Sequence, residues 1–329
     1  MLTVLLTGAN GFLGGHIARE LLRRGHRVRA FVRPRSDRRN LTALPLTLIE
    51  GDITNVADVR RAVAGCDAVI HAAALAQVNP ARDPAIRAVN LGGTEAVLEA
   101  ARHEPIRRLV YVGTANVFGF GSMEQPGDET RPFAGDRYGL DYMTSKRDDT
   151  RRVETAVREG GLSAVCVHPT FMLGPRDYKP TSNAMLLELY RGRVIGYPPG
   201  GKNYVYVGDV ATATVNALTQ GRPGESYILG NQNLTYKEAF SLMARELGVR
   251  PPRWPIPPAL ARLYGRWCDV QANLTGKPAL LNSAMVQVAN DGHYFRVNKA
   301  VHELNLPQTP IQESIRETVN WFREHDYIH

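Results

Sequence analysis

Short apolar runs alternate with longer amphipathic segments through the first half of the chain. The runs are rich in β-branched residues and predict strands over 3–6, 28–32, 46–50, 68–71, 109–112 and 164–167. Between them, apolar residues recur at intervals of three and four, which predicts helices over 14–24, 55–63, 86–102 and 141–158. Repeated strand–helix units predict an α/β fold whose parallel sheet is covered by helices on both faces.

The pattern becomes less regular after His168, where glycines and prolines break the chain into loops. Helical patterns return over 210–219, 236–247 and 311–322, and a proline-rich linker covers 251–258. We therefore predict a first domain over residues 1–170, to which later segments return. A smaller α/β region over 171–329 is expected to cap the carboxyl edge of the sheet.

A glycine-rich turn, TGANGFLG at residues 7–14, follows the first predicted strand and opens the first predicted helix. In that context, glycines let backbone N–H groups approach a pyrophosphate at the positive end of the helix dipole. A turn that serves only packing is the alternative interpretation. The context favours a doubly wound Rossmann domain, and the candidate cofactor contacts in the turn are Gly8, Asn10, Gly11, Phe12, Leu13 and Gly14.

The end of the second predicted strand bears on the choice between NAD and NADP. NAD-binding versions of the fold place a carboxylate there to hold the ribose 2′-hydroxyl. Here Arg33 follows the strand, and Arg35, Arg38 and Arg39 lie close behind it. Guanidinium groups suit a 2′-phosphate, so NADP is favoured and NAD remains possible. A solvated arginine loop is the alternative.

Two further strand ends are expected to complete the cofactor cleft, because ligands of such sheets lie beyond the carboxyl ends of the strands. The candidate contacts are Asp52, Ile53, Ala72, Ala73 and Ala74. The Asp52 carboxylate can accept from the adenine amino group, and the alanines leave room for the dinucleotide. Helix capping and ordinary packing are equally open interpretations of these residues.

Tyr142 and Lys146 are four residues apart in a helical pattern, so both project from one face. A neighbouring ammonium favours the phenolate of a tyrosine, which makes the pair suitable for acid–base chemistry. Thr114 follows the fifth predicted strand and can hydrogen-bond a substrate carbonyl, although a capping role is the alternative. Together the three predict hydride transfer between nicotinamide and an alcohol or ketone.

With these motifs the sequence resembles the extended short-chain dehydrogenase/reductase family over nearly its whole length. The turn is similar to the family's TGxxGxxG, and Tyr142 and Lys146 occupy its YxxxK. Residues 89–94 resemble the family's VNxxGT motif, and residues 114–119 resemble its S/T-x-x-VYG motif. Residues 168–175 resemble its RPxxVYGP motif, and residues 203–211 its NxVHVDDVA motif. The resemblance implies that Pro169, Thr170 and Met172 contact the nicotinamide carboxamide.

Three positions depart from the family pattern: Thr114 replaces the commoner serine, His168 an arginine and Tyr206 a histidine. The last two argue against recognition of a nucleotide-sugar diphosphate. An arginine after an apolar strand end, as at Arg33, resembles the dihydroflavonol 4-reductase and 3β-hydroxysteroid dehydrogenase branch more than the sugar epimerases. In that branch the corresponding arginine is associated with a preference for NADP. Residues 295–300 and the final predicted helix resemble that branch, and also hopanoid-associated sugar epimerase-like proteins.

Composition narrows the function classes. The 329 residues are 43% apolar and carry a formal net charge of +8, but the basic residues are scattered and form no nucleic-acid-binding module. Cys66, Cys166 and Cys268 are widely spaced, so neither a disulfide framework nor a metal site is indicated. No segment has the length of a membrane span, and the N-terminus has the pattern of a strand rather than a signal peptide. We expect a cytoplasmic protein.

The favoured function is an NADPH-dependent carbonyl reductase acting on a fairly apolar small-molecule ketone. The alternative is a nucleotide-sugar or sugar epimerase or dehydratase that holds NAD tightly; a non-catalytic dinucleotide-sensing regulator is less favoured. The family resemblance also implies a homodimer through the predicted helices at 86–102 and 141–158; the alternative is that their apolar residues face only the sheet. Several aromatic and apolar residues of the second half could line a substrate pocket or belong to a core: Tyr178, Met185, Tyr190, Tyr197 and Trp254.

Overall fold

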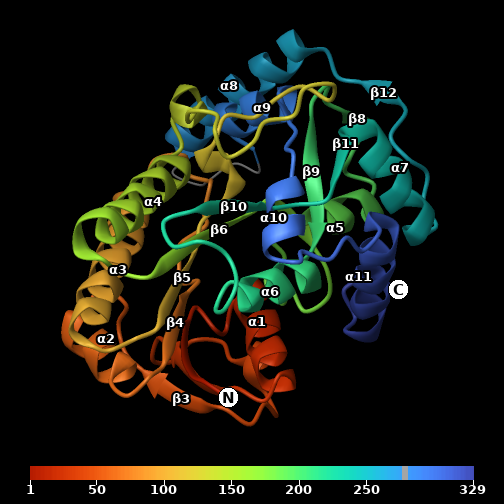
Figure 1. The fold of residues 1–329 in the computed structure, drawn as a ribbon. Coiled ribbons are helices and arrows are strands. Elements are labelled where there is room, and N and C mark those ends of the chain that lie inside the picture. Colours follow the sequence, from red (N-terminus) through yellow and green to blue (C-terminus); the bar gives the residue numbers. More distant parts are fainter. Residues whose placement is uncertain (276–280) are drawn as a thin grey trace.

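The computed structural model describes residues 1–275 and 281–329 and is built around a seven-stranded parallel sheet (Figure 1). The strands run in the order β10-β6-β5-β4-β1-β2-β3. Their bounds are Thr3–Thr7 (β1), Arg27–Val32 (β2), Thr47–Glu50 (β3), Ala68–His71 (β4), Arg108–Val112 (β5), Ala164–Pro169 (β6) and Ser226–Leu229 (β10). The predicted α/β fold is confirmed, and the six predicted strands are found to within two residues at each end.

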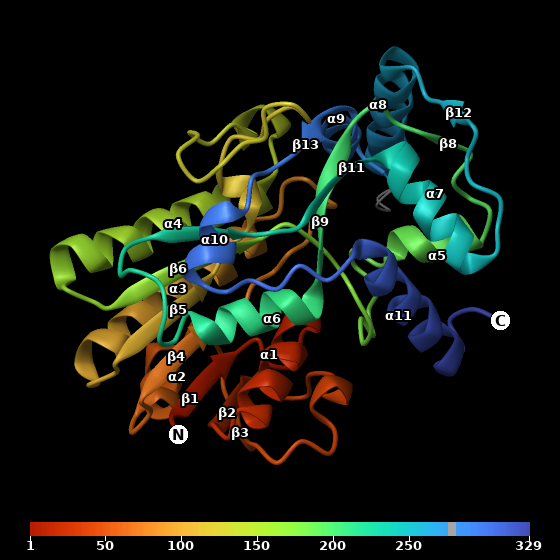
Figure 2. The same cartoon turned by 45° about the vertical axis from the view of Figure 1, so that its right-hand side comes forward.

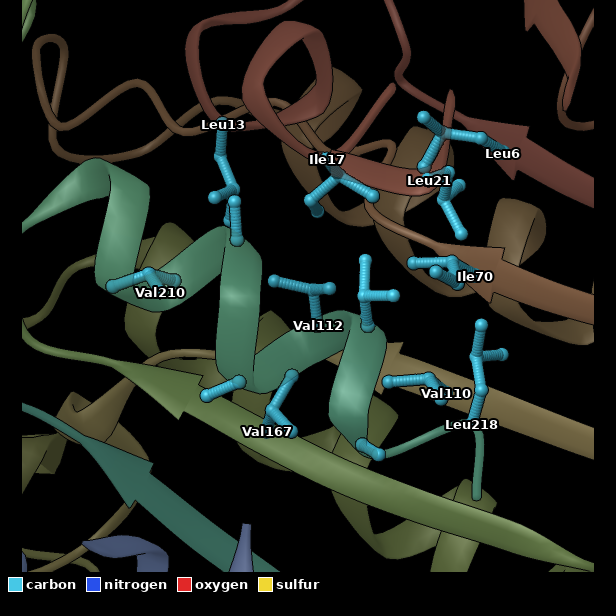
Figure 3. Close-up of a cluster of buried hydrophobic side chains, with 14 of the residues drawn as sticks. Leu6, Leu13, Ile17, Leu21, Ile70, Val110, Val112, Val167, Val210 and Leu218 are labelled. Atoms are coloured by element: carbon cyan, nitrogen blue, oxygen red, sulfur yellow. The ribbon is translucent and has the colours of Figure 1, made fainter. Parts of the chain in front are cut away.

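Helices cover both faces of this sheet, as the two views show (Figures 1 and 2). One face carries α1 (Phe12–Arg23), α6 (Val207–Asn216) and α10 (Asn298–Glu303), and the other α2 (Val56–Val63), α3 (Pro84–His103) and α4 (Asp141–Gly160). Side chains of β1 alternate between the two cores: Val4 and Leu6 enter the first and Leu5 the second. In Figure 3, the α1 side chains Leu13, Ile17 and Leu21 converge with those of the sheet and α6.

The second half of the chain contributes to the main sheet as well as building a smaller unit. Strand β10 extends the sheet beyond β6, and α6 packs against α1. β10 was not predicted, because its four residues lie between glycine-rich turns and have no helix of their own to mark a repeat. With a division at residue 170, β10 and α6 therefore belong to the first domain although they follow it in sequence.

The smaller unit is a sheet centred on β9 (Gly201–Tyr206). β9 pairs with β7 (Phe171–Leu173), β11 (Gln232–Thr235) and β13 (Gly292–His293), and α5 (Ala184–Tyr190), α7 (Tyr236–Leu247) and α11 (Ile311–Glu324) share its core. Tyr178, Met185, Tyr190 and Tyr197 pack on this core, whereas Trp254 is 74% exposed. A core role therefore fits the first four residues, and Trp254 is a surface side chain.

Three further elements lie at the outer end of this unit. The residues predicted as a linker contain β12 (Trp254–Pro255), which pairs with β8 (Gly196–Tyr197). Helices α8 (Pro258–Thr275) and α9 (Ser283–Asn290) follow and pack against each other. Across the described residues, no helix combines the length and apolarity needed to span a bilayer.

Candidate active site

The candidate residues gather at the carboxyl edge of the main sheet, where the strand order reverses between β1 and β4. β2 lies on one side of β1 and β4 on the other, so the helices that leave these strands cover opposite faces. A crevice at such a point is the usual ligand site of doubly wound sheets. The glycine turn follows β1, Ala72 follows β4, Thr114 follows β5 and Thr170 follows β6.

The glycine turn is packed too tightly for side chains. Gly8 has a φ of +69°, and a Cβ there would lie 2.7 Å from the Ala72 carbonyl oxygen. A Cβ on Gly14 would lie 2.0 Å from the carbonyl oxygen of Gly8. Gly11 caps the start of α1 without a side chain over the helix end. The first turn of α1 therefore has no side-chain cap over its N–H groups at the carboxyl edge of the sheet, an arrangement that fits a pyrophosphate.

The loop after β2 supports the glycine turn and carries four arginines, of which two form ion pairs and two do not. The buried Asn40 side chain donates to the Gly11 carbonyl oxygen at 3.2 Å. Arg38 is paired with Glu50, and Arg39 with Asp37 at 2.6 Å. Arg33 and Arg35 are exposed and have no ionic or hydrogen-bonding partner among the described side chains. Of the four arginines of this loop, Arg33 and Arg35 are therefore the two whose guanidinium groups are free to bind a phosphate.

The ends of β3 and β4 have different roles. Asp52 does not cap α2, because Asn55 does so; its Oδ1 accepts instead from Thr54 N and Thr54 Oγ1, at 2.9 and 2.8 Å. Ile53 is buried in the second core. At the end of β4, the Ala73 N–H donates to the Thr7 hydroxyl at 3.2 Å, which fixes the alanine segment beside the glycine turn.

The structure brings Thr114, Tyr142 and Lys146 together. Thr114 lies two residues after the end of β5, and Tyr142 is the second residue of α4. Burial raises the pKa of Tyr142, and a side-chain hydrogen bond with Thr114 lowers it in part. The Thr114 Oγ1 also caps the short turn that follows, accepting from Asn116 N at 3.4 Å. Capping and contact with the tyrosine are therefore compatible roles of this threonine.

Lys146, one helical turn after Tyr142 in α4, is buried and held in one position. Its Nζ donates to the Val112 carbonyl oxygen at 2.9 Å and lies 4.5 Å from the centre of the Tyr111 ring. Burial lowers the pKa of Lys146 to about 8, and the negative charge of Asp149 opposes that change. Asp149 is itself buried and lies one helical turn further along α4. Asp149 was not among the candidate residues predicted from the sequence.

Replacing Asp149 by asparagine is expected to shift the alkaline limb of kcat/KM to lower pH. Removal of the carboxylate takes away the charge that favours the ammonium, so the pKa of Lys146 falls further below about 8. Loss of the proton then removes the positive charge beside Tyr142 at a lower pH. The pH profile of kcat/KM tests this, since it reports groups of the free enzyme. Asp148→Asn, whose carboxylate instead pairs with Arg87 and Arg147, is the matched control; equal profiles for both variants would contradict the role of Asp149.

Asn90, in the stretch that resembles VNxxGT, is another residue that was not among the candidates. Its Oδ1 accepts from the Leu75 N–H at 2.8 Å, and its Nδ2 donates to the Leu75 carbonyl and the Ser145 hydroxyl. It therefore links the loop after β4 to the helix that carries Tyr142. The motif itself was the signal that could have identified it.

The two unusual positions, His168 and Tyr206, offer no cation to a ligand. Burial lowers the pKa of His168 to about 3, and its Nε2 lies 3.1 Å from the Ser226 hydroxyl. Its ring occupies the space above Gly113, where a Cβ would lie 2.4 Å from Nδ1. The Tyr206 hydroxyl donates to Glu317 of α11 at 2.6 Å. Neither residue can bind a diphosphate by charge in this state.

Comparison with known proteins places this arrangement in a family. Residues 4–230 match the model of the NAD dependent epimerase/dehydratase family. The chain belongs to this family. The match covers the turn, the strand ends and the Tyr142–Lys146 helix, so the extended short-chain dehydrogenase/reductase resemblance is confirmed and the chain is an NAD(P)-dependent oxidoreductase of that type.

Among relatives of this epimerase/dehydratase chain, a putative dihydroflavonol 4-reductase of Synechocystis is 30% identical over 98% of the chain and 95% of that protein. A 4-hydroxy-2-methyl-3-oxo-4-farnesyl-3,4-dihydroquinoline-1-oxide ketoreductase of Stigmatella aurantiaca is 31% identical over 78% and 77%. The crystal structure of a Thermus thermophilus UDP-glucose 4-epimerase complexed with NAD has a TM-score of 0.76 and 26% identity, covering 98% of this chain and 99% of that one.

Proposed function

We propose that the protein is an NADPH-dependent reductase of a lipophilic ketone. The observation that carries the proposal is the placement of Thr114 after β5, in contact with Tyr142 of α4 and with Lys146 one helical turn later, at the sheet edge that also carries the glycine turn. The ketoreductase and dihydroflavonol reductase relatives support a carbonyl substrate. The neutral, enclosed His168 supports a substrate without a diphosphate.

The three side chains divide the work at the carbonyl oxygen. The Thr114 and Tyr142 hydroxyls hold the oxygen, and Tyr142 donates its proton to it as the carbonyl carbon is reduced. Lys146, fixed to the Val112 carbonyl, places a positive charge that stabilises the resulting phenolate. When bound, the reduced nicotinamide supplies the hydride.

The cofactor site in this proposal comprises the crevice residues. The turn residues hold the pyrophosphate, Asp52 and Ile53 contact the adenine, and the alanines after β4 line the path of the dinucleotide. At the other end, the backbone of Pro169, Thr170 and Met172 faces the nicotinamide. Pro169 ends β6 and Thr170 follows it, at the same sheet edge as the glycine turn and Ala72, which supports placing these segments around one ligand.

Arg33 and Arg35 carry the proposed preference for NADPH, so Arg33→Ala is expected to weaken NADPH binding about ten- to hundredfold. A charged hydrogen bond to phosphate contributes roughly 1.5–3 kcal/mol, and NADH lacks that phosphate. Titration calorimetry with both dinucleotides measures the difference. The matched control is Arg39→Ala, because Arg39 is already paired with Asp37. An Arg33→Ala protein that still prefers NADPH would assign the preference to another group.

Reduction itself is tested by loss of reduced-nicotinamide absorbance with aromatic, steroidal and aliphatic ketones. The second candidate function, a nucleotide-sugar or sugar epimerase or dehydratase with tightly held NAD, is favoured by the similarity to the NAD-bound UDP-glucose 4-epimerase. That function predicts co-purified NAD and no net consumption of added NADPH. A non-catalytic sensor predicts binding without turnover, which an intact Tyr142–Lys146 pair disfavours.

We further propose that the protein is cytoplasmic. We also propose that it forms a homodimer through the outer faces of α3 and α4. These two helices pack side by side and leave charged residues on an exposed groove with α2, including Glu95, Glu99, Arg102 and Arg152. Light scattering coupled to size-exclusion chromatography measures the oligomeric state.

A further inference from the structure

Helix α8 exposes a row of large apolar side chains to solvent. Its inward residues recur at 261, 265, 268 and 272, and of these Gly265 and Cys268 are fully enclosed against α9. A Cβ on Gly265 would lie 3.0 Å from Ser283 Cα, so the two helices are in close contact there. The opposite side, called here the α8 face, consists of Leu260, Leu263, Tyr264, Trp267, Val270 and Leu274, each at least half exposed.

A helix with one buried stripe does not need a second apolar stripe for folding. Exposed apolar residues are normal when single, but a contiguous row of six marks an interaction site. Tyr264 and Trp267 stack within it, with ring centres 6.0 Å apart. Trp254, in β12 four residues before the helix begins at Pro258, adds a further exposed indole. Helix α8 lies at the outside of the molecule, beyond α9 (Figures 1 and 2).

Charge around the α8 face has one sign. Residues 250–275 contain four arginines, at 250, 253, 262 and 266, and one acidic residue, Asp269. All four arginines are exposed, and none has an ion pair within the described part of the chain. Asp269 is turned inward, where its Oδ1 accepts from the Ser283 N–H of α9. The surface therefore combines aromatic and aliphatic side chains with uncompensated positive charge.

We propose that the α8 face is a docking surface for an anionic lipid bilayer. An interfacial helix inserts an apolar face between lipid headgroups, while flanking arginines bind acidic lipids and tryptophan and tyrosine lie at the boundary. A second copy of the chain fits less well, because a two-fold contact through α8 would place arginines of one copy against those of the other.

The position of α8 connects this surface to the candidate active site. Ala284 of α9 packs in one cluster with Tyr138, Leu140 and Met143, and the partly buried Tyr142 packs against it. Asn282, at the start of α9, donates to the Val78 carbonyl in the loop after β4 at 3.0 Å. One helix therefore separates the α8 face from the elements around Tyr142. Docking there brings the site close to a lipophilic substrate dissolved in the membrane.

Vesicle flotation of the full-length protein tests the proposal without substrate. We expect at least fivefold more protein bound to vesicles of mixed phosphatidylglycerol and phosphatidylcholine than to phosphatidylcholine alone, with binding reduced by salt. The double variant Leu263→Glu/Trp267→Glu should abolish binding. Val56→Glu, which changes an exposed apolar residue on α2, is the matched control and should bind as the unaltered protein does.

Tryptophan emission gives an independent readout. Of the three tryptophans, Trp321 is 5% exposed, so an emission shift to shorter wavelength on adding vesicles reports Trp254 and Trp267. A thermal midpoint and circular dichroism spectrum equal to those of the unaltered protein show that the double variant is folded. Absence of binding, equal binding to both vesicle types, or a dimer that Trp267→Glu dissociates overturns the proposal. Ketone reduction is measured separately in detergent-free buffer, so failure of docking is distinct from failure of the proposed reaction.

Discussion

Tyr142→Phe is expected to lower kcat for ketone reduction by about 10²–10⁴-fold, because the variant keeps the ring but loses the proton that the carbonyl oxygen must receive. The hydroxyl contacts Thr114, and burial keeps it protonated by raising its pKa. NADPH affinity should change little, because the glycine turn is untouched. Steady-state kinetics followed at the reduced-nicotinamide absorbance band, with calorimetry for the cofactor, measure both quantities.

Tyr190→Phe is the matched control for this change. Tyr190 packs on the core of the smaller unit and its hydroxyl donates to the carbonyl oxygen of His329, so its removal should leave kcat unchanged. If Tyr142→Phe retained full turnover, the proton would have to come from another group, and the proposed reductase chemistry would be wrong.

Gly14→Ala is expected to weaken NADPH binding at least about tenfold and to destabilise the fold. The added Cβ would lie 2.0 Å from the Gly8 carbonyl oxygen, so the turn or the start of α1 must move. Forcing extra atoms into a packed site costs about 1–3 kcal/mol or more, and 1.4 kcal/mol is a factor of ten in affinity. Titration calorimetry and thermal unfolding measure the two effects.

Gly160→Ala provides the same substitution where space exists. A Cβ at Gly160 meets only the Arg102 side chain, at 3.8 Å, so cofactor affinity and thermal midpoint should be unchanged. Unaltered NADPH binding in Gly14→Ala would show that the dinucleotide does not use this turn.

The first core could be predicted because its strands are buried on both faces and therefore appear as continuous apolar runs. The second region could not. β8, β12 and β13 have two residues each, and their pairing depends on contacts between distant segments rather than on local pattern. Helix α8 was not predicted either, because a helix with two apolar stripes shows no clear periodicity of apolar residues.

Some residues of the candidate site could be predicted from their spacing in the sequence, and others could be recognised only in the structure. Tyr142 and Lys146 were identified because residues four apart share a helix face, and the structure brings them together with Thr114. Asp149 was missed because charged residues on a helix are usually solvated, and only the structure shows it buried near Lys146. Likewise, sequence could not separate Arg33 from Arg39, since their difference lies in the Asp37 contact.

The returning segments α6 and β10 limit how this enzyme can be recombined with its relatives. α6 supplies Val207 and Val210 to the core beneath the glycine turn, and β10 supplies Leu229. A chimera joined at residue 170 would exchange part of that core together with the substrate region. Helix α10 adds Ala300 to the same core. Grafts intended to change specificity should therefore leave residues 207–229 and α10 with the nucleotide-binding half and transplant the segments between and after them as separate inserts.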